Sequence, residues 1–425
     1  MSNSNSIRQS ELFTKTRKEA PSDEISKNAE LLSRGGFIHK EMSGAYTYLP
    51  LGLRVIKKLE NIIREEMNAI GGQEVSMTVL QEPEIWKKTG RWSDENVDVW
   101  FKTHLKNNTE LGLGCTHEEP ITQMLTEYVS SYRDLPFYIY QIQTKFRNEL
   151  RAKSGILRGR EFLMKDMYSF SRSEKEHDAF YEKSKVAYMN VFQRAGIGHI
   201  TYITFASGGM FSKYSHEFQT ISSVGEDTIY LDEESGIAIN QEVLSDEVLE
   251  SLNLKKEKLV EHKAIEVGNI FSFGKKYSEP LGLLFKNEKG EEIPVLMGAY
   301  GIGLGRLMGT VVETLSDDKG IIWPLSIAPF SVHLLLLGEE EDTIKKANEI
   351  YDTLSNTGVE VLFDDREGVS AGEKFADADL LGMPYRVVVS ARSIKEGGVE
   401  IKKRNEEKGQ VIPGDELLKI LTKKK

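Results

Sequence analysis

The segment from residue 137 to residue 170 most constrains what this chain can fold into. Its two stretches 137–147 and 161–170 read as β-strands: the first is rich in aromatic and β-branched residues, and the second carries three aromatic residues. The connecting loop Arg151–Gly159 is short and polar. A short loop can join antiparallel strands, whereas parallel strands need a long crossover. The sequence therefore predicts an antiparallel sheet with a projecting polar tip.

A long amphipathic helix is predicted ahead of this hairpin. Pro50 suits its first turn and Gly71–Gly72 its end. After the helix, Val75, Met77 and Val79 alternate with polar residues, which indicates a half-buried strand. The apolar positions of the helix recur at a spacing of three to four residues: Val55, Ile56, Leu59, Ile62, Ile63, Met67 and Ile70.

The pattern of the chain changes near Pro324 and Pro329, and prolines there indicate a boundary between domains. Beyond it, strand-like and helical stretches alternate, which indicates a small α/β domain of about a hundred residues. The polar residues 1–20 are expected to stay flexible until something packs on them. The alternating stretches are 332–337, 341–356, 359–363, 373–381 and 386–390.

Composition excludes several kinds of protein. Cys115 is the one cysteine, so neither an intramolecular disulfide nor a cysteine-built zinc site can form, and the histidines show no metal-ligand spacing. No stretch approaches the roughly 20 apolar residues that a membrane helix needs, and the polar start lacks an apolar signal segment. We therefore expect no membrane association and a cytoplasmic location.

The net charge of -11 has the wrong sign for a protein that coats nucleic acid with its whole surface. Any contact with RNA must come from a local basic region. One such region spans residues 145–165, where cations outnumber Glu149 and Glu161. Its cations are Lys145, Arg147, Arg151, Lys153, Arg158, Arg160 and Lys165.

Lys145–Glu149 closes the first strand of the hairpin. A guanidinium fixed on a strand, such as that of Arg147, can grip a phosphate or a carboxylate with two-pronged geometry, and Glu149 can accept a hydrogen bond from an adenine amino group. Taken alone, such a pentapeptide is more often a solvated strand end.

The segment Gly298–Arg306 is rich in glycine and precedes a helix-like stretch. Glycines allow a backbone to approach a nucleotide closely, and Arg306 at a helix start can meet a triphosphate. The segment matches neither a P-loop nor a dinucleotide fingerprint. An isolated glycine cluster is more often a packing device.

In this order, with the helix and strand ahead of them, these elements resemble the three signature motifs of class II aminoacyl-tRNA synthetases. The sequence is similar to bacterial-type prolyl-tRNA synthetases from about residue 20 to about residue 404. The matching segments are Leu31–Ile38, Ser43–Gly52, Thr116–Glu119, Arg158–Asp166, Ser215–Phe218, Glu266–Phe271, Asp364–Arg366 and Phe375–Asp377.

The resemblance implies a mixed α/β fold, with a class II catalytic domain on an antiparallel sheet at 21–325 and an α/β anticodon-binding domain at 326–425. It also implies a homodimer formed through the helix 51–70 and the strand after it. Most bacterial members carry a long editing insertion between about Ile221 and Glu266. This chain resembles a short form, with a helical linker at 241–260 in its place.

The chain departs from the family pattern at three places. Thr78 follows Met77 where proline is usual, which weakens the expectation about the dimer contact. Cys115 replaces the proline of the usual Gly-Pro-Thr, so the proline-binding loop is expected to be less rigid. Asn269 stands where histidine is common.

The resemblance implies a role for each matched residue. Thr116 and Glu118 would hold the secondary ammonium of proline, and Arg147 its carboxylate or the α-phosphate of ATP. Thr116–Glu119 alone reads equally well as a helix N-terminus, and His216 as a satisfied core histidine. The implied proline site comprises Thr116, Glu118, Arg147, Phe162, His216 and Phe271, with Glu217 beside it. The implied ATP site comprises Arg147, Glu149, Arg158, Glu266, Asn269, Gly301, Gly303 and Arg306. Arg147 and Arg306 would be catalytic, and Glu266 is a candidate magnesium ligand.

The implied reaction activates L-proline with ATP to prolyl-adenylate and transfers it to the 3' end of tRNA(Pro). Two alternatives remain. A class II synthetase for another amino acid, such as threonine, is disfavoured because the chain has no Cys/His zinc set. A non-catalytic synthetase-like protein is disfavoured because both ATP-site arginines, Arg147 and Arg306, are present.

Overall fold

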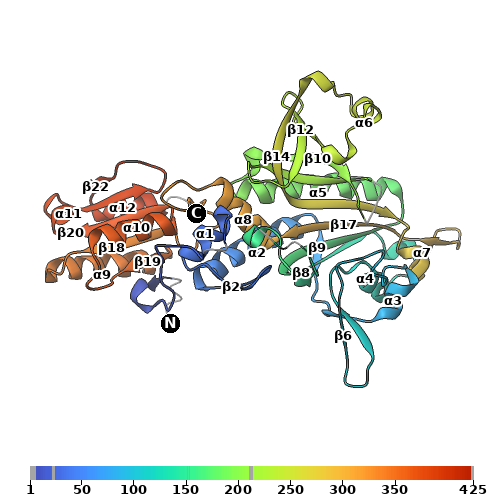
Figure 1. Cartoon of the computed structure of the whole chain (residues 1–425), viewed down its shortest axis with the longest axis horizontal. Coiled ribbons are helices and arrows are strands. Elements are labelled where there is room, and N and C mark those ends of the chain that lie inside the picture. The colour runs from blue at the N-terminus through green and yellow to red at the C-terminus, as the bar shows by residue number, and fades with distance from the viewer. Residues whose placement is uncertain (1–5, 22–23, 151, 153, 210–213, 423–425) are drawn as a thin grey trace. The chain divides into compact units, whose positions relative to one another are not determined.

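The computed structural model describes residues 6–21, 24–150, 152, 154–209 and 214–422. The chain divides into two compact units, which are coloured along the sequence in Figure 1. One comprises residues 41–46 and 59–310, and the other the described residues of 1–40, 47–58 and 311–425. Within the described ranges, no helix is long and apolar enough to cross a membrane.

The first unit is built on a large, mostly antiparallel sheet. The predicted hairpin is confirmed, because its two strands pair antiparallel from Phe137 opposite Phe170 to Phe146 opposite Glu161. The strand order is β11 (Tyr214–Ile221), β10 (Thr201–Ser207), β13 (Ile237–Asn240), β12 (Asp227–Asp232), β14 (Leu259–Gly274), β17 (Leu296–Gly303), β9 (Glu161–Ser171), β8 (Phe137–Phe146) and β4 (Gly72–Glu74).

Helix α5 (Glu174–Arg194) runs along one face of this sheet (Figure 1). Its aromatic side chains pack on aromatic residues of the strands: Phe180 stacks on Tyr138, with ring centroids 3.5 Å apart, and Tyr188 lies 4.9 Å from Phe218. Buried rings of this kind contribute both apolar area and specific ring geometry. Helix α5 therefore covers only one of the two faces of the sheet.

The predicted helix after Pro50 is confirmed as α2 (Pro50–Ala69). Its apolar stripe is covered by the chain itself, since Val55, Leu59 and Ile63 are fully buried. The stripe is thus a core feature, and it does not supply the exposed apolar surface on which the expected dimer contact rested.

The predicted strand at 75–79 is wrong. Strand β4 ends at Glu74, and Val75 makes the last regular bond, to the carbonyl of Tyr140 at 2.8 Å. Beyond it, side chains replace the backbone ladder: the Gln141 side chain accepts from the Met77 amide at 3.1 Å, and the Gln143 side chain donates to the Met77 carbonyl. The alternation of apolar residues in the sequence could not show that side-chain hydrogen bonds take the place of backbone hydrogen bonds here.

The predicted tip of the loop between β8 and β9 lies partly outside the described residues, which omit Arg151 and Lys153. Its described part forms a turn at Gly155–Leu157 whose Ile156 and Leu157 are buried. A Cβ at Gly309 of α8 (Leu304–Thr314) would lie 2.8 Å from the Leu157 side chain, so the loop packs closely on that helix. Ile156 and Leu157 therefore hold the described end of the loop against the protein.

The basic region is also smaller than its composition indicates. Lys145 and Lys165 are fully buried, because alternate residues of β8 and β9 point into the core. Arg151 and Lys153 lie outside the described residues.

The predicted helical linker is confirmed. After β12 and β13 the chain forms α6 (Asp246–Ser251) between two single-turn helices, Gln241–Val243 and Lys256–Lys258. Ile239, Val248 and Leu249 form a small core beneath it. No separately folded insertion therefore lies between Asn240 and Leu259, all of whose residues are described.

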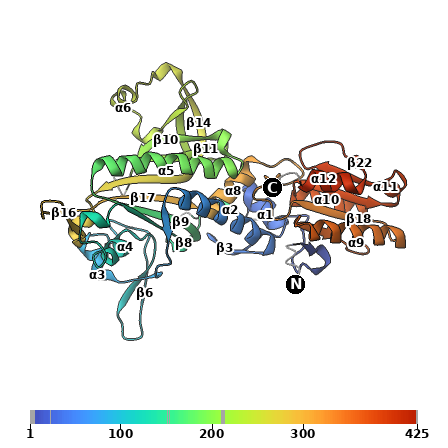
Figure 2. The ribbon, with the colours of Figure 1, turned by 180° about the vertical axis from the view of Figure 1, so that it is seen from behind.

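The second unit carries the predicted alternation of strands and helices (Figure 2). Its first strands pair parallel, and β21 and β22 continue the sheet antiparallel. The sheet order is β1 (Ile7–Arg8), β19 (Val361–Asp364), β18 (Val332–Leu337), β20 (Tyr385–Ser390), β21 (Val399–Lys403) and β22 (Gln410–Ile412), with α9 (Glu341–Asn356) and α10 (Ala371–Leu381) in the connections.

Residues 1–20, which were expected to stay flexible until something packs on them, join the sheet in their described part. Ile7 and Arg8 pair parallel with β19. The Arg8 guanidinium donates to Asp365 at 3.0 Å, and the Gln9 side chain bonds to the buried His333 at 2.8 Å. These partners lie more than 300 residues away in the sequence, which is why composition at the N-terminus could not indicate them.

Candidate active site

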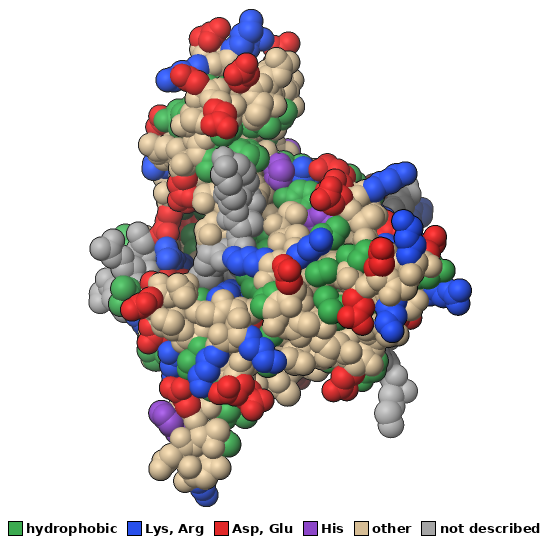
Figure 3. Space-filling model, turned by 90° about the vertical axis from the view of Figure 1, so that its right-hand side faces the viewer, with side chains coloured by type: hydrophobic (Ala, Val, Ile, Leu, Met, Phe, Trp, Pro, Cys, Tyr) green, Lys and Arg blue, Asp and Glu red, His purple; other side chains and the backbone are tan. Residues whose placement is uncertain are grey.

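A cavity of about 520 Å³ opens on the face of the large sheet. On the face of the molecule shown in Figure 3, acidic and basic side chains are interspersed. The net charge of the chain therefore does not describe the charge at any one place on this surface. The cavity is lined by all but one of the predicted site residues: Thr116, Glu118, Arg147, Glu149, Arg158, Phe162, Glu266, Asn269, Phe271, Gly301, Gly303 and Arg306.

Strand β9 supplies one wall through its alternation. Phe162, Met164, Asp166 and Tyr168 all line the cavity. Successive side chains of a strand point to opposite faces of the sheet, so the residues between them face the helix side. Lys165 is one of these, and its ammonium is buried against the Tyr188 hydroxyl.

The glycines of β17 form an open floor. Gly301 lies between Asn269 of β14 and Asp166 of β9 in the pairing register. A Cβ placed there would meet its nearest neighbours only at 3.9 and 4.0 Å, so the missing side chain leaves space for a ligand instead of relieving a clash. Gly303 ends the strand immediately before α8 begins.

Arg306 lies in the first turn of α8, where backbone amides favour anions. Its Nη1 contacts the Glu266 carboxylate at 2.9 Å, and its Nε donates to the Leu157 carbonyl at 2.8 Å. Asn269 donates to the other oxygen of Glu266 at 2.9 Å. The guanidinium is therefore held on two sides with about a third of its side chain exposed.

Arg147 and Glu149 follow β8 at the opposite wall. The Arg147 Nε donates to the Cys115 carbonyl at 3.3 Å, and its guanidinium lies 5.4 Å from the ring centre of Phe162. Glu149 accepts from Arg158 at 2.7 and 3.0 Å. A nucleotide that engaged Glu149 would therefore meet Arg158 in the same place.

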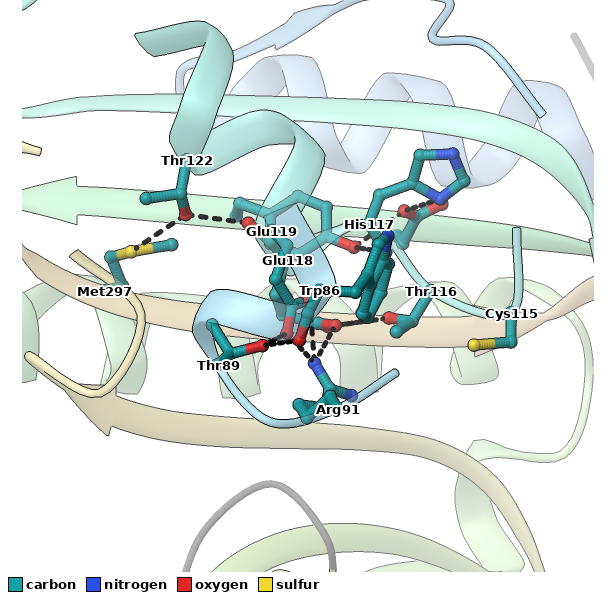
Figure 4. A network of polar contacts seen from close by, with 12 residues as sticks. Trp86, Thr89, Arg91, Cys115, Thr116, His117, Glu118, Glu119, Thr122 and Met297 are labelled. Carbon is teal, nitrogen blue, oxygen red and sulfur yellow. Dashed lines mark hydrogen bonds and ion pairs between the residues drawn. The ribbon is translucent and has the colours of Figure 1, made fainter. Parts of the chain in front are cut away.

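Thr116 and Glu118 meet at the start of α4 (Glu118–Leu125), as Figure 4 shows. The Thr116 hydroxyl lies 2.7 Å from both oxygens of the Glu118 carboxylate. The helix N-terminus stabilises negative charge at this position. The prediction that these two residues share a site thus agrees with their geometry.

Sequence reasoning missed Arg91, which lies beside Glu118 and Glu119 (Figure 4). Arg91 is only 5% exposed, and its Nη1 contacts Glu118 at 3.2 Å and both oxygens of Glu119 at 3.0 and 2.9 Å. The indole of Trp86 and the phenol of Tyr277 lie on it at 5.3 and 5.2 Å. No periodicity or motif links Arg91 to glutamates 27 residues later.

A second buried network, also missed, lies beneath the same loop. Lys145 contacts Asp166 at 2.9 Å and His117 Nδ1 at 2.8 Å. Burial, together with Lys145, lowers the pKa of His117 to about 4, so its ring is neutral. Because Nδ1 accepts from Lys145, Nε2 carries the proton and donates to the Thr78 carbonyl at 3.0 Å. The network fixes the backbone from which Thr116 and Glu118 project.

Burial would raise the pKa of Asp166, but Lys145, His117 and Gln141 outweigh it, and the pKa falls below its ordinary value. Tyr168 donates to the same carboxylate at 2.9 Å. Asp166 therefore stays charged at the base of the cavity.

Glu217 lines the cavity from β11. Burial and the neighbouring Glu266 raise its pKa to about 8, although Gln219 and Asn240 donate to it at 2.9 and 3.1 Å. Glu217 is therefore largely protonated at neutral pH, and a cation bound beside it would favour its charged form.

The prediction that His216 belongs to the proline site is wrong. Adjacent strand residues face opposite sides of a sheet, so Glu217 faces the cavity and His216 faces α5. There the His216 ring contacts the Tyr181 hydroxyl at 2.8 Å and packs edge-on against Phe205. Burial lowers the pKa of His216 to about 4. His216 is therefore a core histidine with its own hydrogen-bond partner, which was the alternative interpretation of this residue.

Asp364 and Arg366, which the resemblance assigned to anticodon binding, lie in an internal cluster. Arg366 bonds to Asp364 at 2.7 Å and to Asp377 at 2.8 Å, and Asp364 is fully buried. Lys374 lies 3.7 Å from the same Asp364 carboxylate. These groups satisfy one another.

Two family models match the chain. Residues 101–315 match the tRNA synthetase class II core domain (G, H, P, S and T), and residues 326–424 match an anticodon binding domain. Proline–tRNA ligase of Hyphomonas neptunium is 37% identical over 94% of this chain and 95% of its own length. The same enzyme of Caulobacter vibrioides is 36% identical over 99% of this chain and 100% of its own length.

Solved structures share the fold. Prolyl-tRNA synthetase of Giardia lamblia, in complex with prolyl-adenylate, superposes with a TM-score of 0.76 at 19% identity over 91% of this chain and 74% of that one. The Cryptosporidium parvum enzyme complexed with L-proline and AMP gives a TM-score of 0.73 at 17% identity over 92% and 73% of the two chains. Two matched domains and relatives similar over nearly their whole length leave one conclusion: the chain belongs to the proline–tRNA ligase family of class II synthetases.

Proposed function

We propose that the cavity is where proline and ATP meet, with each residue that lines it in the role described below. The observation that carries the proposal is the convergence of Thr116, Glu118, Arg147 and Arg306 on one space of about 520 Å³, although they come from three separate parts of the chain. In a proline–tRNA ligase, that convergence supports a shared site for the amino acid and the nucleotide.

Thr116 and Glu118 suit the secondary ammonium of proline. That group carries two N–H donors, and the Thr116 hydroxyl and the Glu118 carboxylate offer two adjacent acceptors. Phe162 and Phe271 form the apolar wall for the pyrrolidine ring. Arg147, packed on Phe162, faces the carboxylate of proline or the α-phosphate.

Glu149 and Arg158 are assigned to the adenine and phosphate end of ATP, and Asn269 to the ribose. The open floor at Gly301 and Gly303 admits the nucleotide. When ATP binds, Arg306 gives up its contact with Glu266 and binds the terminal phosphates instead, since the start of α8 favours anions.

Glu266 fits magnesium, because carboxylates are its preferred protein ligands and a cation there would also favour the charged form of Glu217, whose pKa is raised by burial and by Glu266. Magnesium held there with ATP would neutralise charge on the phosphates. Arg147 and Arg306 supply the remaining positive charge.

The reaction needs no side-chain nucleophile. The carboxylate of proline attacks the α-phosphorus in line, and the bond to pyrophosphate breaks. A hydroxyl of the terminal ribose of tRNA then attacks the acyl carbon and releases AMP. The residues of the chain hold the reactants in line and stabilise charge that develops on the phosphates.

We also propose the finer assignments that go with this reaction: tRNA(Pro) as the RNA substrate, a homodimer, a cytoplasmic location, and a division of labour between a catalytic domain at 21–325 and an anticodon-binding domain at 326–425. The match of residues 326–424 to an anticodon binding domain supports the last of these.

ATP–pyrophosphate exchange, run separately with each of the twenty amino acids, tests the proposal. We expect exchange to be strongest with proline and to require magnesium. Exchange that is stronger with threonine or another amino acid, or that is independent of any amino acid, would overturn it.

A further inference from the structure

Behind the proposed proline subsite, one buried cation faces two buried carboxylates. Arg91, Glu118 and Glu119 are 5%, 3% and 0% exposed. Water cannot screen charges at such depth, so the balance among these three groups sets the local potential. Lys276 also feels both carboxylates but is exposed to solvent, which weakens its influence.

The three groups are not equivalent. Glu119 receives the stronger bonds, because both of its oxygens lie within 3.0 Å of Arg91 Nη1 and the Thr89 hydroxyl donates to it at 2.8 Å. Burial raises the pKa of Glu119 to about 7 and Glu118 adds to the rise, whereas Arg91 and Thr89 oppose it, so Glu119 is ionised above neutral pH, where the pairing is tested. Glu118 receives one contact from Arg91, at 3.2 Å. Glu118 lines the cavity, whereas Arg91 and Glu119 do not.

We propose that Arg91 and Glu119 form a charge-setting pair: Glu119 neutralises Arg91, and Glu118 keeps the one negative charge that selects an ammonium group. This inference rests on the proposed function of the cavity and adds a positioning role for two residues outside it. The Trp86 and Tyr277 rings lie on the Arg91 guanidinium and hold it beside the two carboxylates.

The pairing predicts opposite effects for two changes. In Glu119→Gln, Arg91 loses its counterion and turns its charge onto Glu118, so the cluster becomes neutral and attracts an ammonium weakly. Adding Arg91→Met removes the surplus cation and restores the single negative charge on Glu118. A purely structural role predicts the reverse, because the second substitution removes further hydrogen bonds from the core.

The experiment measures the KM of proline and of ATP in pyrophosphate exchange, with folding checked by circular dichroism. We expect Glu119→Gln to raise the KM of proline about tenfold or more while the KM of ATP changes less than about twofold, and we expect the double variant to return the KM of proline to within about threefold of wild type. As a matched control, Arg172→Met/Glu176→Gln removes an exposed ion pair far from the cavity and should change neither constant.

Thr89→Val provides a milder variant that leaves all three charged groups in place. It removes the donor to Glu119, so we expect a rise of about two- to fivefold in the KM of proline alone. If Glu119→Gln does not fold, the double variant and Thr89→Val still decide the question.

A double variant that binds proline no better than Glu119→Gln, or tenfold worse than wild type, overturns the inference. An equal rise in the KM of ATP in Glu119→Gln also overturns it, and so does an unchanged KM of proline in both Glu119→Gln and Thr89→Val. Because wild-type exchange with proline tests the function separately, a failure of the charge-setting pair leaves that function standing.

Discussion

Two groups of buried charges, one in each unit, differ in how their charges balance. In the unit built on β18 to β20, Asp364 and Asp377 face Arg366 and Lys374, and each group finds a partner of opposite charge. Beside the cavity, one cation, Arg91, is shared by two carboxylates, Glu118 and Glu119. A balanced cluster holds a fold together, whereas an unbalanced cluster beside a cavity favours a charged ligand. The site is therefore marked by its surplus charge, not by the number of charged residues.

The first test breaks the balanced cluster. Asp364→Asn leaves Arg366 and Lys374 without their shared buried anion, so we expect the free energy of unfolding of that unit to fall by about 3–5 kcal/mol. Hydrogen exchange of β19 amides measures the loss. The exposed Asp352→Asn on α9 is the control. Unchanged protection in Asp364→Asn would show that the cluster does not stabilise the sheet.

The second test removes positive charge from the cavity. Arg147→Ala and Arg306→Ala should each cost about 2.7–4 kcal/mol of transition-state stabilisation, which is roughly a hundred- to thousandfold in proline-dependent pyrophosphate exchange. Melting temperatures should stay near wild type because both side chains are partly exposed. Arg392→Ala, whose side chain is 86% exposed, controls for loss of an arginine. Near-normal exchange in either cavity variant would refute the assignment.

The third test separates charge from shape within the cavity. Alanine carries the same ammonium and carboxylate as proline, and the missing ring carbons cost only about 1–3 kcal/mol per methylene in discrimination. We therefore expect measurable activation of alanine. The linker at 241–260 forms one short helix and contains no separately folded hydrolytic domain, so we also expect no correction of the mischarged product.

Purified enzyme incubated with preformed alanyl-tRNA(Pro) checks that expectation. Release of alanine should not exceed the rate without enzyme, while alanine-dependent pyrophosphate exchange should be detectable. Clear deacylation would mean that a hydrolytic site exists elsewhere in the chain.

The smallest effect is expected at His216, which faces away from the cavity. His216→Phe keeps its packing against Phe205 and Tyr181 but loses one neutral hydrogen bond, so stability should fall by about 0.5–1.5 kcal/mol. The KM values of proline and ATP should remain near wild type. Glu217→Gln, one residue further and facing the cavity, should change the KM of ATP instead. A large change in the KM of proline in His216→Phe would return that residue to the site.

Most of the secondary structure and the identity of most cavity residues could be predicted from the sequence. The hairpin 137–171, the helix after Pro50 and the alternation from Val332 to Ser390 follow from local periodicity, which a few neighbouring residues determine. The motif residues Thr116, Glu118, Arg147 and Arg306 followed from family resemblance, and the structure brings all four to one cavity.

The same reasoning failed wherever distant parts of the chain meet. The irregular segment after Glu74 depends on Gln141 and Gln143, and the strand at Ile7–Arg8 depends on β19. His216 was assigned to the wrong face because a motif names residues without their orientation.

By itself, the sequence determined the elements, their order and the family, because backbone preferences and side-chain spacing act over short stretches. Only the tertiary structure decided which charges are compensated. Arg91 reaches Glu118 and Glu119, and Lys145 reaches Asp166, only after packing has removed water from between them. The strength of an electrostatic interaction depends on how deeply the charges are buried and on which charges lie beside them, and both are set only when the chain has folded.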